Sequence, residues 1–81
     1  MISRAQDIAA NERRAQVEAE AQQRLGQSPY PTLRCVSCCF DDGVLTMRGR
    51  VASFYLKQVA QTAVSKLHDV ERIENCIEVS H

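Results

Sequence analysis

The stretch "FDDGVLTMRGRV", Phe40 to Val51, decides the fold of this chain. It places Asp42 and Gly43 between two runs in which apolar and polar residues alternate, "TLRCVSCCF" before the turn and "VLTMRGRV" from its end onward. Alternation with a period of two is typical of a half-buried strand. Asp-Gly is a strong hairpin signal, because both residues tolerate the positive φ angles of a tight turn. The sequence therefore predicts two antiparallel strands joined at Asp42 and Gly43.

The same alternation assigns the two faces of this hairpin, since side chains two residues apart on a strand point to the same side. The apolar face comprises Val36, Cys38 and Phe40 on the first strand and Leu45, Met47 and Val51 on the second. The opposite face comprises Cys35, Ser37, Cys39, Val44, Thr46, Arg48 and Arg50. We expect the first face to build the core and the second to stay open to solvent or to a partner.

Residues 4 to 25 form the first predicted helix. They are rich in Ala, Glu, Gln and Arg, with Ser3 as the capping residue and Gly26 as the end. Only the second half carries a continuous apolar stripe, made of Val17, Ala21 and Leu25. We therefore expect residues 1 to 14 to be an N-terminal helical extension that protrudes or frays, and residues 15 to 81 to be a single domain.

Residues 54 to 67 repeat apolar side chains at helical spacing after Ser53, the expected N-cap, and predict a second helix. Residues 70 to 79 alternate again and predict a third strand. A strand, helix, strand crossover within one sheet makes the two strands parallel. The expected fold class is α+β, a two-layer α-β-β-α-β arrangement in which a three-stranded mixed sheet carries both helices on one face.

Composition narrows the classes of function. The 81 residues make one small domain, and 10 basic and 10 acidic side chains give a formal net charge of 0. Without a net positive field, nucleic acid is not an expected partner. The first residues contain no apolar run of signal-peptide length, and no segment approaches a membrane span. As it stands, the chain is expected in the cytoplasm, with peripheral association with the cell envelope as the alternative.

The segment from Val36 to Val79 resembles the BON domain, the bacterial module named for osmotically induced periplasmic and nodulation proteins. "DGVLTMRGRV" matches the family's Asp/Asn-Gly-x-Val-x-Leu-x-Gly-x-Val, "LKQVAQTAV" its following helix, and "VERIENCIEV" its closing Val-x-x-Val-x-Asn-x-Ile-x-Val. The resemblance implies a non-enzymatic module that associates with phospholipid, another hydrophobic ligand or an envelope-linked partner. The chain departs from the pattern in lacking a signal segment, in having one copy, and in placing His68 and Asp69 where the helix usually ends at Gly.

Gly49 stands at the position of the family's characteristic glycine. A glycine just before the end of a strand allows a bend toward the next helix, or allows that helix to pack closely on the backbone. Asp42, Gly43 and Gly49 are therefore predicted to be structural turn and bend residues.

The four cysteines suggest a metal or redox site, with His68 and His81 as further ligands, but the spacing argues against both. On a strand, Cys35 and Cys38 point to opposite faces, and Cys35 and Cys39 lie roughly 13 Å apart. We expect reduced thiols, with Cys38 in the core. The sequence shows no Ser-His-Asp order, paired carboxylates or phosphate loop, so neither an enzyme nor a cofactor is expected. The element order also recurs in KH-type RNA-binding folds, but their Gly-x-x-Gly loop is absent.

Two surfaces are candidates for binding. Arg50, Phe54, Tyr55 and Lys57 combine aromatic and basic residues, as a phospholipid, membrane or partner surface would. The simpler and favoured alternative for Phe54 is that it covers the end of the core. The open sheet face, with Cys35, Cys39, Thr46 and Cys76, and the long first helix offer an alternative function in protein interaction or homodimerisation.

Overall fold

The hairpin forms where the sequence predicts it. The computed structural model describes residues 4–80, with side chains from residue 11 onward. Strands β1 (Ser37–Asp41) and β2 (Val44–Val51) pair antiparallel, with Phe40 opposite Leu45. Asp42 and Gly43 have φ angles of 49° and 79°, so both turn residues adopt the left-handed conformation that a two-residue hairpin requires.

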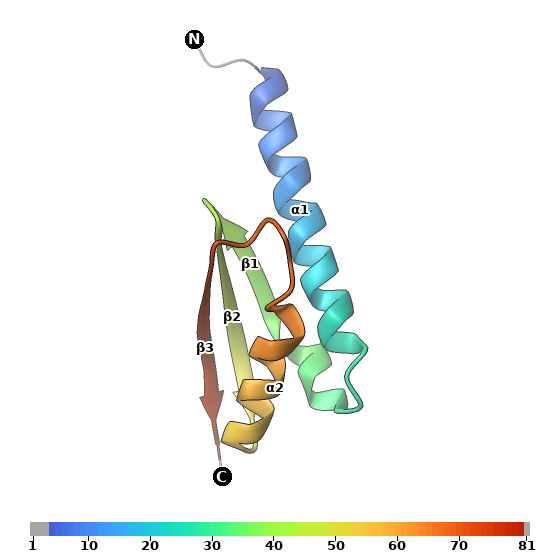
Figure 1. Cartoon of the computed structure of the whole chain (residues 1–81), viewed down its shortest axis with the longest axis vertical. Coiled ribbons are helices and arrows are strands. Elements are labelled where there is room, and N and C mark those ends of the chain that lie inside the picture. The colour runs from blue at the N-terminus through green and yellow to red at the C-terminus, as the bar shows by residue number, and fades with distance from the viewer. Residues whose placement is uncertain (1–3, 81) are drawn as a thin grey trace.

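The third strand, β3 (Arg72–Val79), runs parallel to β2, and the sheet order is β1-β2-β3 (Figure 1). At one end of this pairing, the Gly43 carbonyl accepts hydrogen bonds from the N–H groups of Glu71, at 2.8 Å, and Arg72, at 3.2 Å. At the other end, the Ser80 N–H donates to the Val51 carbonyl at 2.8 Å. The turn therefore fixes the register of both strand pairs.

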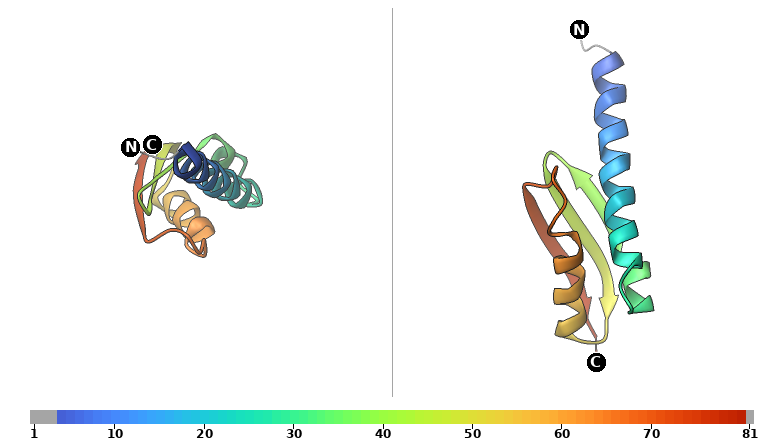
Figure 2. Two further views of the ribbon diagram at one scale, coloured as in Figure 1. Left: turned by 90° about the horizontal axis from the view of Figure 1, so that it is seen from above. Right: turned by 45° about the vertical axis from the view of Figure 1, so that its right-hand side comes forward.

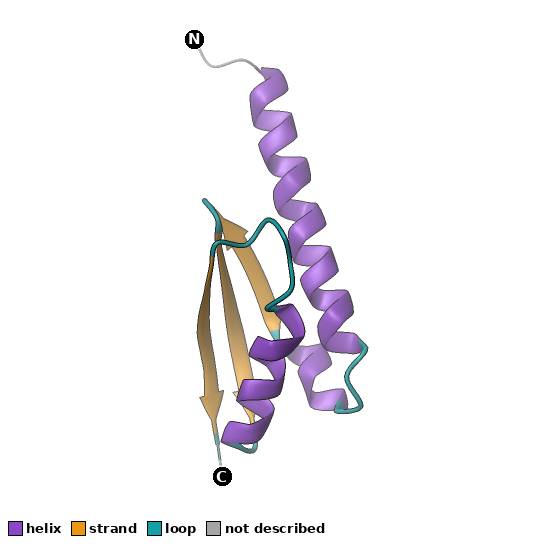
Figure 3. Ribbon diagram, in the orientation of Figure 1, coloured by secondary structure: helices purple, strands orange, loops and turns teal. Residues whose placement is uncertain are grey.

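Helices α1 (Arg4–Gly26) and α2 (Phe54–Val64) cover the same face of the sheet (Figure 3). The Ser53 hydroxyl caps α2 by accepting the N–H of Leu56 at 3.3 Å, as predicted. The predicted α+β class, with two layers and a mixed sheet of three strands, is confirmed. The buried apolar side chains between the layers are Val17, Ala21, Leu25, Leu33, Val36, Phe40, Leu45, Met47, Val51, Ala60, Val64, Leu67 and Ile77.

The start of the first predicted strand is wrong. Pro31–Cys35 forms a short 3-10 helix, η1, so Cys35 does not belong to the sheet. Pro31 at its start has a φ angle suited to a helical turn and no N–H to lose. The Leu33 N–H donates to the Tyr30 carbonyl at 3.1 Å, and Leu33 is fully buried. Local turn geometry and burial of one leucine thus override the alternating pattern.

The second helix is also shorter than predicted, ending at Val64 instead of residue 67. The Ser65 hydroxyl donates to the Thr62 carbonyl at 2.8 Å, which occupies an acceptor that a continuing helix would use. Leu67 follows in a turn and is still buried. The apolar spacing therefore predicted the burial correctly but not the backbone conformation.

Helix α1 covers the outer edge of β1. The Phe40 N–H, which points away from β2, donates to the Glu18 carboxylate at 2.8 Å. The Gln22 side chain donates to the Arg34 carbonyl at 3.1 Å. The helix runs without a break from Arg4 and extends beyond the sheet (Figure 1). Ser3 lies outside the described residues, and the domain boundary before residue 15 stays a prediction.

Gly49 allows a close backbone contact, but with a different neighbour from the one expected. A Cβ atom at this position would lie 3.3 Å from the Cα of Val36 and 3.8 Å from the Cys35 carbonyl oxygen. Val36 is buried at the point where the chain leaves η1 and enters β1. The glycine therefore makes room for the entry to the first strand, and the expectation of close packing against the second helix is wrong.

We predict that Gly49→Ala lowers the free energy of unfolding by about 1–2 kcal/mol, because the added methyl group presses on buried backbone. Gly26→Ala is the matched control: nothing lies within 4 Å of a Cβ atom there, and Gly26 is helical. Its stability should be unchanged or raised by up to about 1 kcal/mol. Urea unfolding of both variants measures the difference, and equal effects would contradict the proposed close contact.

Candidate functional site

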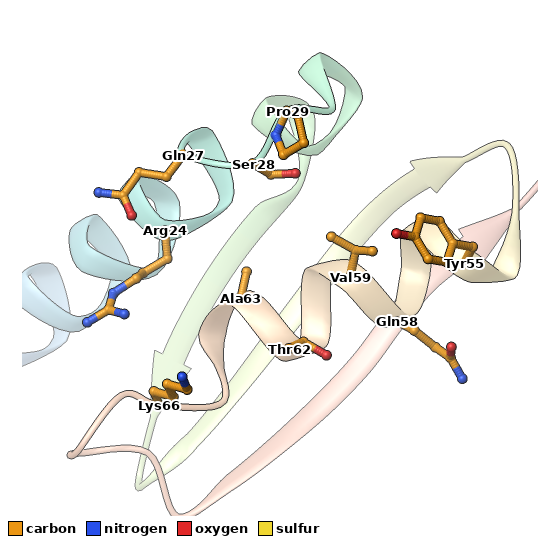
Figure 4. Close-up of a pocket in the computed structure, with 10 residues that line it drawn as sticks. All are labelled: Arg24, Gln27, Ser28, Pro29, Tyr55, Gln58, Val59, Thr62, Ala63 and Lys66. Carbon is orange, nitrogen blue, oxygen red and sulfur yellow. The ribbon is translucent and has the colours of Figure 1, made fainter.

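A groove lies between the end of α1, the loop that follows it, and one side of α2 (Figure 4). Its volume is about 510 Å³. Tyr55, Val59 and Ala63 recur every four residues along α2 and form one wall, while Ser28 and Pro29 belong to the opposite wall. The helical repeat of α2 thus supplies a second side-chain row, next to the row that faces the core.

The groove is apolar in its middle and basic at one end. Val59, Ala63 and Pro29 provide the apolar part, while Arg24 of α1 and Lys66 after α2 lie at the end opposite Tyr55 (Figure 4). The nearest anionic group to Arg24 is the Glu20 carboxylate, at 3.8 Å across exposed side chains. Such a pair is weak, so both cations remain able to bind an anion. The arrangement suits an elongated molecule with an apolar body and an acidic end.

Tyr55, at the other end of the groove, contacts Tyr30 of the loop. The hydroxyl groups of Tyr30 and Tyr55 lie 3.3 Å apart, and their rings meet edge to face with centroids 5.9 Å apart. The Tyr30 N–H donates to the Ser28 hydroxyl at 3.2 Å, which keeps this part of the loop folded against itself. The hydrogen bond that the Tyr30 hydroxyl donates to Tyr55, followed by burial, raises the pKa of Tyr30 above its ordinary value of 10.0. The contact therefore links the loop to α2.

The residues predicted as one lipid or partner surface have different surroundings in the structure. Only Tyr55 lines the groove. Arg50 lies on the open sheet face, 3.5 Å from the Glu78 carboxylate. Lys57 is half-buried, and its carbonyl accepts a hydrogen bond from Asn75 at 3.1 Å. The groove therefore uses one of the four predicted residues.

The favoured expectation that Phe54 covers the end of the core is wrong, because this side chain is 67% exposed. The Ser53 cap fixes the rotation of α2, and the core-facing side then runs through Leu56, Ala60 and Val64. Phe54 lies two residues before Leu56, on another side of the helix. Phe54 is therefore an exposed aromatic residue that does not line the groove.

The open sheet face holds thiols and ion pairs. Cys39 lies opposite Thr46, and Cys76 lies opposite Arg48. The central strand β2 separates the two cysteines, and all four thiols of the chain are free. Cys35, predicted on this face, is instead exposed at the end of η1. The open sheet face therefore carries Cys39 and Cys76 but not Cys35. The ion pairs Arg72–Glu74 and Arg50–Glu78 add charged side chains to this face.

Cys38 lies on the helix-facing side of the sheet, as predicted, and packs half-buried against the core. Burial and, to a smaller extent, the nearby Glu18 carboxylate raise the pKa of its thiol to about 11. Both effects disfavour the charged form of the group. At neutral pH this cysteine is a protonated, weakly nucleophilic side chain.

Asn75 has a role that the sequence analysis missed. Its amide group donates to the Lys57 carbonyl at 3.1 Å and to the Gln61 side chain at 3.3 Å, so it fastens β3 to α2. Its side-chain oxygen accepts the N–H of Ile77 at 3.2 Å. The signal was present, because Asn75 is the one polar residue in the otherwise apolar row of the third strand.

Among the described residues, no three His, Cys, Asp or Glu side chains gather where they could hold a metal ion. No helix in this part of the chain has both the length and the apolar character needed to cross a bilayer. The chain matches no model of a known protein family and no curated protein.

We predict that Tyr55→Phe lowers the pKa of Tyr30. The hydroxyl bond stabilises the neutral phenol, and its loss makes deprotonation easier, so the titration moves down in pH. Tyr30 is then the only tyrosine, and tyrosinate absorbance reports it alone. Phe54→Leu is the control at the neighbouring position and should leave the titration of Tyr30 in place. An unchanged titration in Tyr55→Phe would contradict the observed contact.

Proposed function

We propose that this chain is a non-catalytic, BON-type binding module that holds an anionic amphiphile, such as a phospholipid, in the groove between its helices. The observation that supports it most directly is the succession along one groove of an aromatic end, an apolar middle and a basic end. The sequence resemblance from Val36 to Val79 supports the same class of function independently.

The dimensions and chemistry of the groove suit this ligand. Its volume of about 510 Å³ lies within the range usual for small-molecule sites. Each buried methylene group of an acyl chain contributes about 0.8 kcal/mol, so a few groups along Val59 and Ala63 supply most of the affinity. Arg24 and Lys66 then orient the acidic end. Because Lys66 is exposed, this electrostatic part is sensitive to salt.

The prediction is that the protein co-sediments with vesicles containing phosphatidylglycerol, and more weakly with pure phosphatidylcholine vesicles. Arg24→Gln with Lys66→Gln should reduce binding to the anionic vesicles, on the order of tenfold for two charges at low salt. Arg13→Gln with Lys57→Gln removes the same charge from the same two helices outside the groove. This control pair should bind nearly as well as the unaltered chain.

Vesicle binding that the two double variants weaken equally would place the interaction on the overall charge and not in the groove. No sedimentation at low salt with either vesicle would contradict the lipid function altogether. Both results can be interpreted only if the variants are folded. The circular dichroism spectrum and the melting temperature of each variant verify its fold.

A second candidate function is docking of another protein chain through α1 and the open sheet face. The observation that favours it is the length of α1, which continues beyond the sheet and exposes Asn11–Gln16 (Figure 1). Arg14 in this stretch pairs with Asp41 of β1 at 3.3 Å, but an exposed pair stabilises the helix little, so a partner that covers the stretch would stabilise it.

We predict for this second function that removing residues 1–14 abolishes association through α1. Analytical ultracentrifugation of the full and shortened chains at several concentrations measures it. The shortened chain keeps Val17, Ala21 and Leu25 and should remain folded. Full and shortened chains with identical mass distributions would contradict self-association through α1, without bearing on the groove.

A further inference from the structure

The two outer edges of the sheet are treated differently. Along β1, α1 lies beside the edge, and Glu18 accepts the outward N–H of Phe40. Along β3, no other element of the described chain lies beyond the strand, in either the front view or the view from above (Figures 1 and 2). An uncovered strand edge presents unpaired N–H and C=O groups to any chain that approaches in an extended conformation.

The groups on the outer edge of β3 follow from its pairing with β2. The N–H groups of Arg72 and Ser80 point toward β2, where they donate to Gly43 and Val51. The backbone N–H and C=O groups of successive strand residues point alternately to the two sides of the strand. The groups that point outward, away from β2, are therefore those of Ile73, Asn75, Ile77 and Val79. Within the described chain, the Ile77 N–H is satisfied by the side chain of its own neighbour Asn75. The other outward groups are left to solvent or to a partner.

The sequence of β3 lacks most of the features that protect an edge. It is 8 residues long, "RIENCIEV", with no proline, glycine or lysine. Apolar residues occupy most of its helix-facing positions. Natural edge strands are usually shortened, bulged, or given proline or inward charges where pairing is to be avoided. This edge is long and regular instead, with Asn75 as its single local cap.

We propose that β3 pairs antiparallel with β3 of a second copy of this chain, about a twofold axis at Asn75, so that the two sheets become one of six strands. In this register Ile73 lies opposite Ile77 of the partner subunit, and Asn75 lies opposite the partner's Asn75. Outward groups then meet outward groups, which gives about six backbone hydrogen bonds. The helices of both copies lie on the same side of the joined sheet.

Charge selects this register. It places Arg72 opposite Glu78 of the partner subunit, twice by symmetry, on the open face where both side chains are exposed. The two β3 strands can shift relative to each other only by steps that keep the helix-facing side chains of both copies on the same side of the joined sheet. The two neighbouring symmetric registers, about Glu74 and about Cys76, would place Glu74 opposite the partner's Glu74 and opposite the partner's Glu78, respectively. Opposite charges across a strand pair are favourable and like charges are not.

Asn75 makes this pairing reversible. In the single chain its side-chain oxygen occupies the Ile77 N–H, and pairing replaces that bond with one to the carbonyl of the partner's Ile73. The other side-chain bonds of Asn75, to Lys57 and Gln61, do not involve the edge and remain. The monomer therefore leaves no edge donor at Ile77 unsatisfied, and the dimer forms at high protein concentration.

The test is a charge exchange on the full chain, with the mass measured by analytical ultracentrifugation across a concentration series. Arg72→Glu and Glu78→Arg each turn two attractive pairs into repulsive ones, and each should weaken dimerisation on the order of tenfold. The double variant restores opposite charges and should restore the dimer. Arg48→Glu is the matched control, since this exposed arginine lies on the same face but on the central strand. It should dimerise like the unaltered chain.

Hydrogen exchange supplies a second reading. The amides of Ile73 and Asn75 should become protected as concentration rises, whereas that of Cys38, on the other edge, should not. A monomer at the highest concentration overturns the proposal. So does a dimer that Arg48→Glu weakens as much as Arg72→Glu, or one that the double variant fails to restore. A dimer lost on removal of residues 1–14 but indifferent to the charge exchange would assign association to α1 and overturn edge pairing.

Discussion

The fold depends on Gly43, because this residue closes the hairpin and its carbonyl also binds the start of β3. Its positive φ angle, together with that of Asp42, closes the hairpin and fixes β1 against β2. Its carbonyl accepts the N–H groups of Glu71 and Arg72 and so fixes β3 against β2. A slip of one residue in either pairing would turn every buried side chain of that strand toward solvent. One turn thus sets which face of the whole sheet is apolar, and hence where both helices must pack.

The groove follows from how each helix is attached to that face. Glu18 and Gln22 hold α1 at the β1 side of the sheet, while Asn75 holds α2 at the β3 side. The helices are therefore fastened to opposite edges, and the loop between α1 and η1 bridges them through the contact of Tyr30 with Tyr55. The groove lies between the two helices, and its apolar part, Val59 and Ala63, is half-buried at the margin of the core.

The features that the sequence predicted correctly are those that depend on residues close together along the chain. The turn, the face of each strand, the Ser53 cap and the buried row of α1 all follow from local spacing, and all are present in the structure. The 3-10 helix was missed because "TLRC" alternates like a strand, while burial of Leu33 depends on packing. The groove was missed for the same reason, since Arg24 and Lys66 meet only after both helices are placed.

Asn75 connects the two surfaces for which binding is proposed. One end of its side chain holds α2, a wall of the groove, and the other end holds an edge amide of β3. Pairing at the edge removes the bond between the Asn75 side-chain oxygen and the Ile77 N–H. The side chain is then held only by its hydrogen bonds to Lys57 and Gln61. If a ligand in the groove shifts α2, the same side chain must follow, and its hold on the edge amide changes with it. Such coupling is reciprocal by thermodynamic necessity, so an edge partner would alter affinity in the groove by the factor with which the groove ligand alters pairing. The half-buried Asn75 is well suited to this, because both its amide nitrogen and its side-chain oxygen are hydrogen-bonded, and a buried polar group that loses its partner costs stability.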